Sequence, residues 1–376
     1  MGTLVGDMRV LRIDQNSVRR ELIGVGGIGG GIVFDLEGNR TLDRNESRPG
    51  RLLDVRDYCK LHIVIHYVAR LLGARVSGAP FHVLPLGKVG DDGPGRQVVK
   101  EMTDTGIDTR MVFAIADRPT LFSVCFQYPD GAGGNITTNN SAASELSESD
   151  IDTIFDLLKA GAEQVIALAV PEIPLGVRQY FLKAATHTGA FRVASFVPAE
   201  IGLARRAGVF EMLDLVSLNE AEAGELIDSR FSFTEREAFI AKCQDFLRQS
   251  CPNLRMVVSL GKDGAYGVTE NLCNYCPAPQ VKAESTAGAG DALLGSIIAS
   301  IAAGIPFVRS EALESTSPRT TETALELGVL LASYKCMSPH TIHPSACIDT
   351  LVDFASSQGR PFSAQLQELV TTAVPG

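Results

Sequence analysis

The stretch of sequence that decides the fold is ESTAGAGDALLGSIIASIAAG, residues 284–304. Its second part predicts an apolar helix that Gly304 and Pro306 would end. Its first part is therefore a glycine-bearing loop at the N-terminus of a helix. Such a loop directs several backbone amides at one place, where the helix dipole adds partial positive charge. We therefore predict a phosphate-binding loop here.

Four consecutive residues of this loop carry the predicted chemistry: Gly288, Ala289, Gly290 and Asp291. The amides of the first three would form an anion hole for the charge that develops as a phosphoryl group moves. The carboxylate of Asp291 could accept the proton of an attacking hydroxyl. Taken alone, the pattern is also compatible with a glycine-rich turn that ends in a helix-capping aspartate.

Strands and helices alternate over most of the chain. Apolar runs predict strands at 22–25, 82–86, 165–170, 191–197, 213–218 and 256–260, and helical spacing predicts helices at 60–72, 96–105, 154–160, 177–187, 203–210, 220–228 and 235–250. This alternation favours an α/β fold, a doubly wound and mostly parallel sheet flanked by helices. Residues 29–41 also have β pattern, 111–115 and 121–128 are expected to pair, and 87–93 and 131–140 are expected to be loops.

Composition and net charge limit the classes of partner that the protein is expected to bind. Net charge is −10 and no run is rich in lysine or arginine, so no nucleic-acid partner is expected. The first seven residues, MGTLVGD, lack a signal-peptide pattern and no apolar segment is long enough to span a bilayer, so we expect no membrane partner and a cytoplasmic protein. The eight cysteines are scattered, and we expect no structural metal site.

Several motifs together resemble the ribokinase-like (PfkB-type) carbohydrate kinases. TAGAGD at 286–291 is similar to the C-terminal signature of that family, NEAE at 219–222 to its Asn-x-x-Glu, and VVSLGKDGA at 257–265 to its strand and turn along ATP. The resemblance implies transfer of the ATP γ-phosphate to a hydroxyl of a small sugar-like or nucleoside acceptor, with Asp291 as base and Gly288–Asp291 as anion hole.

The resemblance also implies roles for individual residues. Asn219 and Glu222 would place Mg²⁺ and the phosphates. The ATP-binding residues would be Ser259, Gly261, Gly264 and Thr286. ATP and Mg²⁺ are therefore the expected cofactors.

The resemblance covers roughly residues 22–350 and implies a small β-structured lid. We expect an N-terminal extension at 1–20 and one kinase domain at 21–376, with lid segments at about 29–57 and 108–140. A lid of exposed strands can pair with a second copy, which suggests a homodimer.

The acceptor-binding half departs from the family pattern. Gly31 stands where an aspartate usually holds sugar hydroxyls, and Ser285 stands where an aspartate often helps to bind a monovalent cation, which makes such an ion doubtful. Cys59, Lys60 and Val64 replace a Gly-Gly pair and an asparagine. Four polar residues are candidates for binding the acceptor: Asn45, Lys60, His62 and Asn135.

Two alternatives remain. The rewritten acceptor half is compatible with a catalytically silent ribokinase-fold protein that binds a metabolite and regulates another process. A second alternative is an NAD-binding oxidoreductase, because GVGGIG at 24–29 satisfies G-x-G-x-x-G after a strand. That motif requires a helix to begin at the glycines, whereas the residues that follow continue with β pattern.

Overall fold

The computed structural model describes residues 9–14, 17–77, 80–130, 133–160, 162–310 and 320–372. The first seven residues, which bear on the prediction of localisation, lie outside the described part. No helix in the described ranges is long and apolar enough to cross a membrane. Within the same ranges, no cluster of three or more His, Cys, Asp or Glu side chains could hold a metal ion.

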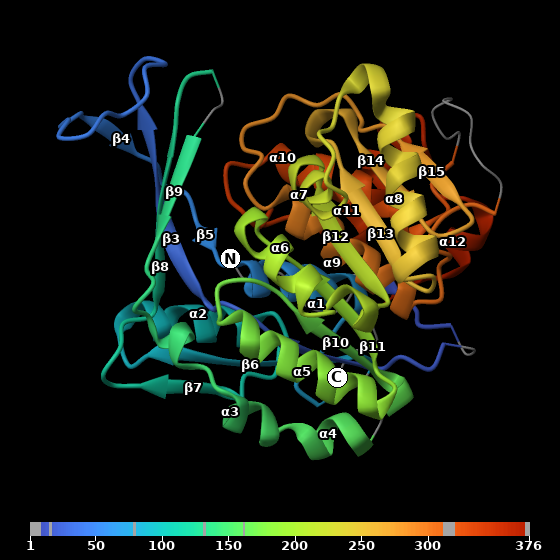
Figure 1. Ribbon diagram of the computed structural model, residues 1–376, viewed down its shortest axis with the longest axis horizontal. Helices are drawn as coiled ribbons and strands as arrows, with labels where there is room; N and C mark the ends of the chain where they lie inside the picture. Colours follow the sequence, from blue (N-terminus) through green and yellow to red (C-terminus); the bar gives the residue numbers. More distant parts are fainter. Residues whose placement is uncertain are drawn as a thin grey trace.

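Nine strands form the main sheet, in the order β15-β14-β13-β12-β11-β10-β2-β6-β7 (Figure 1). The pairs from β13 to β7 are parallel, and β14 and β15 are antiparallel additions at one edge. The strands of this sheet are β2 Glu21–Val25, β6 His82–Gly90, β7 Val112–Ile115, β10 Val165–Ala169, β11 Phe191–Ser195, β12 Leu215–Asn219, β13 Arg255–Ser259, β14 Ala265–Val268 and β15 Cys273–Cys276.

Helices cover both faces of this sheet. The helices are α1 Lys60–Leu72, α2 Gly93–Asp104, α3 Glu148–Asp152, α4 Phe155–Ala160, α5 Leu175–Thr188, α6 Pro198–Arg206, α7 Glu220–Leu226, α8 Arg236–Ser250, α9 Ala289–Ala302, α10 Ala324–Cys336, α11 Ile348–Ser357 and α12 Ala364–Glu368. One core cluster joins the sheet to α1, α9, α10 and α11, and a second joins it to α3–α8. All five residues of β10 are buried, as expected for a parallel strand covered on both sides. The predicted α/β sheet flanked by helices is confirmed.

A second, five-stranded sheet stands apart from the main body, at the left of Figure 1. Its strands are β3 Gly29–Leu36, β4 Gly50–Leu52, β5 Asp57–Tyr58, β8 Leu121–Gln127 and β9 Gly133–Thr137. Strand β3 lies parallel to β8, which pairs antiparallel with β9. This sheet is called the lid below. Its strands lie in the predicted segments 29–57 and 108–140, except that β5 extends to Tyr58, whereas β7 of the second segment belongs to the main sheet.

Glycines allow the lid strands to approach closely. A Cβ at Gly29 would lie 2.0 Å from the Leu121 carbonyl oxygen, so no other residue fits at this position of β3. Gly29 begins a strand and not a helix. The glycine-rich segment that suggested dinucleotide binding therefore lacks the helix N-terminus on which that binding depends.

Three local predictions were wrong. Residues 111–115 and 121–128 do not pair: β7 lies beside β6 in the main sheet, whereas β8 belongs to the lid. The expected loop at 87–93 is strand as far as Gly90, because β7 supplies a hydrogen-bonding partner there. The expected loop at 131–140 contains β9, which β8 pairs.

The N-terminal segment is tied to the C-terminal one. Strand β1, Arg9–Leu11, pairs antiparallel with β16, Val370–Thr372. Val10 and Leu11 are buried. This part of the predicted extension thus contributes to the core.

Candidate active site

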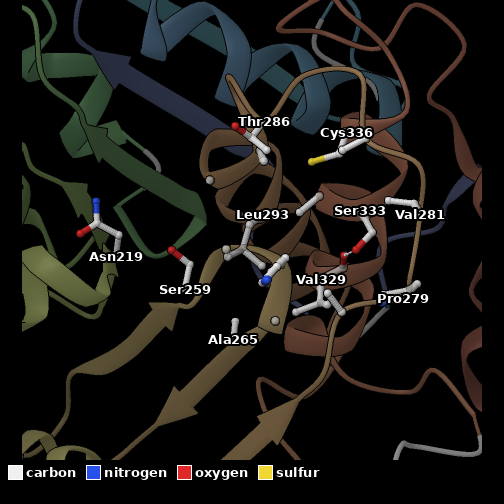
Figure 2. Close-up of a pocket in the computed structure, with 18 of the residues that line it drawn as sticks. Asn219, Ser259, Ala265, Pro279, Val281, Thr286, Leu293, Val329, Ser333 and Cys336 are labelled. Carbon is white, nitrogen blue, oxygen red and sulfur yellow. Dashed lines mark hydrogen bonds between the residues drawn. The ribbon is translucent and has the colours of Figure 1, made fainter. Parts of the chain in front are cut away.

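A cavity of about 310 Å³ lies between the β13–β14 turn and helices α9 and α10 (Figure 2). Asn219, Ser259 and Thr286 supply polar atoms at its lining, whereas Leu293 and Val329 line it with apolar side chains. A cavity with one apolar wall and a few convergent polar groups is typical of a small-molecule site.

The glycine-bearing loop leads into helix α9, which begins at Ala289. Gly288 is the N-cap of α9 and has φ +78°, in the left-handed region. A Cβ there would lie 2.5 Å from the Thr341 carbonyl oxygen, so both conformation and space require glycine. In the first turn of α9, the Ala289 N–H donates to the Thr286 carbonyl at 3.1 Å. The N–H groups of Gly290 and Asp291, which follow it, have no acceptor within the helix. Ala289 and Gly290 line the cavity.

Asp291 lies in this first turn and is buried. Its Oδ1 is 3.6 Å from the Nζ of Lys60, the first residue of α1. The Asp291 charge is the main reason why the pKa of Lys60 is raised. The predicted base and one predicted acceptor-binding residue are thus an ion pair that joins two helix N-termini.

Glu172 is a further acidic group here, and it was missed by the sequence analysis. Its Oε2 accepts a hydrogen bond from the backbone N–H of Lys60 at 3.1 Å, so it caps α1 from another element. Burial raises the pKa of Glu172 to about 7, although the charge of Lys60 opposes the shift. Its φ of +77° is unusual for a residue other than glycine. The sequence signal that could have identified Glu172 is its position, because it is an acidic residue just after the C-terminal end of a parallel strand.

Asp57 occupies the space that a side chain at Gly31 would need. A Cβ at Gly31 would lie 2.4 Å from the Asp57 Oδ2. The same oxygen accepts hydrogen bonds from Ser123 Oγ at 2.7 Å and Cys125 Sγ at 3.5 Å. Burial raises the pKa of Asp57. A carboxylate from β5 therefore stands beside the position where the resemblance placed a missing one, and no sequence pattern marked it.

Asn219 and Glu222 form a capping box at the start of α7. Asn219 Oδ1 accepts from the Glu222 N–H at 2.8 Å, and Glu222 Oε2 accepts from the Asn219 N–H at 2.9 Å. Asn219 also lines the cavity. Burial is the main cause of the raised pKa of Glu222, and the charge of Asp291 adds to it.

The turn after β13 closes the other side of the cavity. Leu260 N–H donates to the Gly264 carbonyl at 2.8 Å, and Gly261 and Gly264 have φ of +55° and +104°. A Cβ at Gly264 would lie 2.1 Å from the Cys276 carbonyl oxygen. The four residues predicted to bind ATP all line this cavity: Ser259, Gly261, Gly264 and Thr286.

Three predicted acceptor-binding residues lie elsewhere. His62 lines a second cavity of about 540 Å³, together with Arg56, His66, Arg70 and other residues. Burial lowers its pKa to about 3, and its Nδ1 has no partner in the described part of the chain. Asn45 and Asn135 are exposed on the lid and line neither cavity.

Solved structures of similar shape are sugar and nucleoside kinases. A ribokinase from Cryptococcus neoformans var. grubii serotype A in complex with ADP has a TM-score of 0.66 and 18% identity, over 89% of this chain and 99% of that chain. A ribokinase II from E. coli with ATP and Mg²⁺ gives 0.65 and 18%, over 90% and 99%. A Burkholderia thailandensis nucleoside kinase with inosine gives 0.64 and 15%, over 90% and 99%. At these identities the likeness shows the fold.

Curated relatives match over parts of their length. The ribokinase of Staphylococcus aureus is 26% identical over 212 residues, which are 56% of this chain and 66% of that protein. The ATP-dependent 6-phosphofructokinase isozyme 2 of Escherichia coli is 32% identical over 90 residues, which are 24% of this chain and 28% of that protein.

The family assignment rests on a longer match. The description "pfkB family carbohydrate kinase" matches residues 64–346, a range that includes the α9 loop, the capping box of α7 and the β13–β14 turn. The lid strand β3 and Lys60 precede residue 64 and lie outside the matched range. The chain belongs to the pfkB family of carbohydrate kinases.

Proposed function

We propose that this protein transfers the γ-phosphate of ATP to a hydroxyl of a small sugar-like or nucleoside acceptor. The observation that carries the proposal is the position of Asp291. Its buried carboxylate lies in the first turn of α9, directly after the loop of Gly288, and 3.6 Å from the Lys60 ammonium. This position supports a role for Asp291 as base, with the α9 loop as anion hole and the Lys60 ammonium as a fixed cation beside it.

The reaction follows from these groups. Asp291 accepts the proton of the acceptor hydroxyl as its oxygen forms a bond to the γ-phosphorus. The bond between that phosphorus and the bridging oxygen breaks, and ADP leaves with the bond's electron pair. The amides of the α9 loop stabilise the charge that develops on the phosphoryl oxygens. The Lys60 ammonium lies beside the Asp291 carboxylate.

The nucleotide would occupy the cavity between the β13–β14 turn and α10. Leu293 and Val329 line the cavity with apolar side chains against which a base could pack (Figure 2). Ser259, Thr286 and the α9 loop would bind the phosphates. Two structural neighbours are complexes with ADP and with ATP and Mg²⁺, which supports a nucleotide as the ligand of this fold.

The donor set near Asp291 fits Mg²⁺. Glu222 and Asn219 supply oxygen atoms, which this ion prefers. Burial and the nearby charge of Asp291 raise the pKa of Glu222, so a cation would relieve the crowding of negative charge. When bound with ATP, Mg²⁺ would neutralise phosphate charge, and Asn219 and Glu222 would hold it. We infer no monovalent cation.

The acceptor would be held by carboxylates as well as by Lys60. Asp57 stands beside Gly31, and Glu172 caps the helix that begins with Lys60. Carboxylates are acceptors of hydrogen bonds from hydroxyl groups. We therefore favour a polyhydroxylated acceptor, a class that includes both sugars and the ribose of nucleosides.

The test is ATP turnover against a panel of sugars and nucleosides, with Asp291→Asn as the control. We expect at least one compound to stimulate turnover, and the variant to lose roughly 10²–10⁴-fold in kcat while it still binds nucleotide. If no hydroxyl compound raises turnover above that of the variant, the kinase proposal is refuted and the metabolite-binding regulator is favoured. If the variant equals wild type, Asp291 is not the base.

We also propose a homodimer through the lid. Leu52 on β4 and Ile136 on β9 are 58% and 68% exposed, and both lie on short strands of this sheet. Ile136→Asp should convert the dimer to a monomer in analytical ultracentrifugation, whereas a wild-type monomer at micromolar concentration would contradict the proposed dimer.

The eight cysteines are all free thiols, which supports a reducing compartment such as the cytoplasm.

A further inference from the structure

Helix α10 carries a lysine inside the protein. Lys335 has no exposed surface, and its Nζ donates a hydrogen bond to the carbonyl oxygen of Ser285 at 2.9 Å. Lysine is rarely fully buried without a partner. The partner here is a neutral backbone oxygen, which leaves a net positive charge inside the protein.

Lys335 contacts Ser285, near the start of the loop that leads into α9. Its neighbour Cys336 accepts hydrogen bonds through its carbonyl oxygen from the N–H groups of Glu284, at 2.7 Å, and Ser285, at 3.3 Å. The C-terminal end of α10 thus holds residues 284–285 by three hydrogen bonds. These residues lead directly into the anion hole at Gly288.

The environment keeps this ammonium charged near neutral pH. Burial lowers the pKa of Lys335 to about 8, and the shift is limited by Cys336, Asp57 and Asp291, whose charges favour the protonated form. Burial lowers the pKa of the nearby His343 imidazole, and the charge of Lys335 lowers it further. The ammonium therefore lies within the field of the predicted catalytic carboxylate without pairing with it directly.

A monovalent cation does not fit at this place. The aspartate that often helps to bind one is replaced by Ser285, and the Ser285 carbonyl oxygen already accepts a hydrogen bond from Lys335. A second cation beside a buried ammonium would meet repulsion in a medium of low dielectric constant.

We propose that the Lys335 ammonium takes over the role of a monovalent cation: it is a positioning residue that holds the 284–291 loop, by charge and by its bond to Ser285, in the conformation that receives the ATP phosphates. This inference rests on the proposed function. It predicts a kinase that needs no monovalent cation and whose nucleotide affinity depends on a residue that does not touch the nucleotide.

The first experiment measures MgADP and MgATP affinity by isothermal titration calorimetry for wild type, Lys335→Met and Lys242→Met. Lys242 is exposed on α8, so its substitution makes the same change of residue and charge far from the loop. We expect Lys335→Met to weaken nucleotide binding roughly tenfold or more, and Lys242→Met to have the affinity of wild type. Equal affinities for the two variants would overturn the inference.

The second experiment needs no variant. Wild-type turnover is measured in potassium, sodium and choline chloride at equal ionic strength, and the three rates should agree within about twofold, because the charge is already covalently attached. A stimulation of roughly fivefold or more by potassium would overturn the proposed replacement.

The third readout separates positioning from a general structural role. Nucleotide affinity of wild type should fall as pH rises through about 8, where the Lys335 ammonium loses its proton, and Lys335→Met should lack that decline. A decline of equal size in both proteins would overturn the assignment. Failure of the proposed function looks different: wild type would bind nucleotide with the predicted dependence on Lys335 and yet phosphorylate no acceptor.

Discussion

The α9 loop offers a sharp prediction, because two of its glycines occupy opposite environments. Gly288 has φ +78°, and a Cβ there would lie 2.5 Å from the Thr341 carbonyl oxygen. Gly290 lies within α9, and a Cβ there would have no atom within 4 Å. Gly288→Ala and Gly290→Ala are therefore the same chemical change with opposite structural consequences.

The magnitude follows from two costs. A left-handed conformation costs a residue with a Cβ about 1–2 kcal/mol. Relieving a contact with a backbone oxygen in packed surroundings costs about 1–3 kcal/mol more. Gly288→Ala should therefore lower the free energy of unfolding by about 2–5 kcal/mol. Gly290→Ala should leave it unchanged or raise it by up to about 1 kcal/mol, because alanine is the better helix former.

The assay is urea-induced unfolding followed by circular dichroism, with nucleotide absent so that only the protein's own contacts are compared. Gly288→Ala should also lower kcat by roughly 10²–10³-fold, as displacement of an oxyanion donor does. Equal unfolding free energies for the two variants would refute the account of Gly288. A destabilised Gly288→Ala with unchanged kcat would refute the role of the loop as anion hole.

Three further predictions concern charged groups. Lys60→Met should lower kcat/KM roughly 10–100-fold in steady-state assays, because it removes the cation beside Asp291. The pKa of Glu172 is raised from 4.5 to about 7 in the folded protein. The contribution of Glu172 to the free energy of unfolding therefore declines as pH rises across that window. In urea unfolding, the stability of Glu172→Gln relative to wild type should be higher at pH 8 than at pH 5. A hydrogen bond to Glu21 raises the pKa of His82 above 6.5 in the folded protein. The stabilisation of the fold by protonated His82 is therefore complete below pH 6.5 and is lost as pH rises through the folded pKa. His82→Asn should remove this pH dependence of the urea unfolding midpoint.

Local sequence predicted the elements that have local causes. The helix at 60–72 was predicted with the bounds that the structure shows, because its apolar residues keep helical spacing and Gly73 supplies the left-handed C-cap. Residues 286–291 likewise indicated a loop and a helix start, because glycine and an apolar helix follow each other directly in the chain. The family assignment followed from the same short motifs.

Long-range pairing was not predictable in the same way. Strand β8 has the pattern of any half-buried strand, and its place in the lid depends on β3, which lies about ninety residues earlier in the chain. The predicted pairing with 111–115 failed because neighbouring strands in sequence went to different sheets. Strand β9 looked like a loop because its residues are polar and glycine-rich, and only hydrogen bonds from β8 make it a strand.

The sequence alone predicted the loop that we propose as the anion hole, because such a hole is made by consecutive amides at one helix end, and consecutive residues can be recognised in a chain. Only the tertiary structure decided the rest of the site. Asp57 comes from β5, Glu172 from the loop after β10 and Lys335 from α10, and each acquires its role from a neighbour distant in sequence. Burial, which sets their charges, is a property of the folded chain and not of any motif.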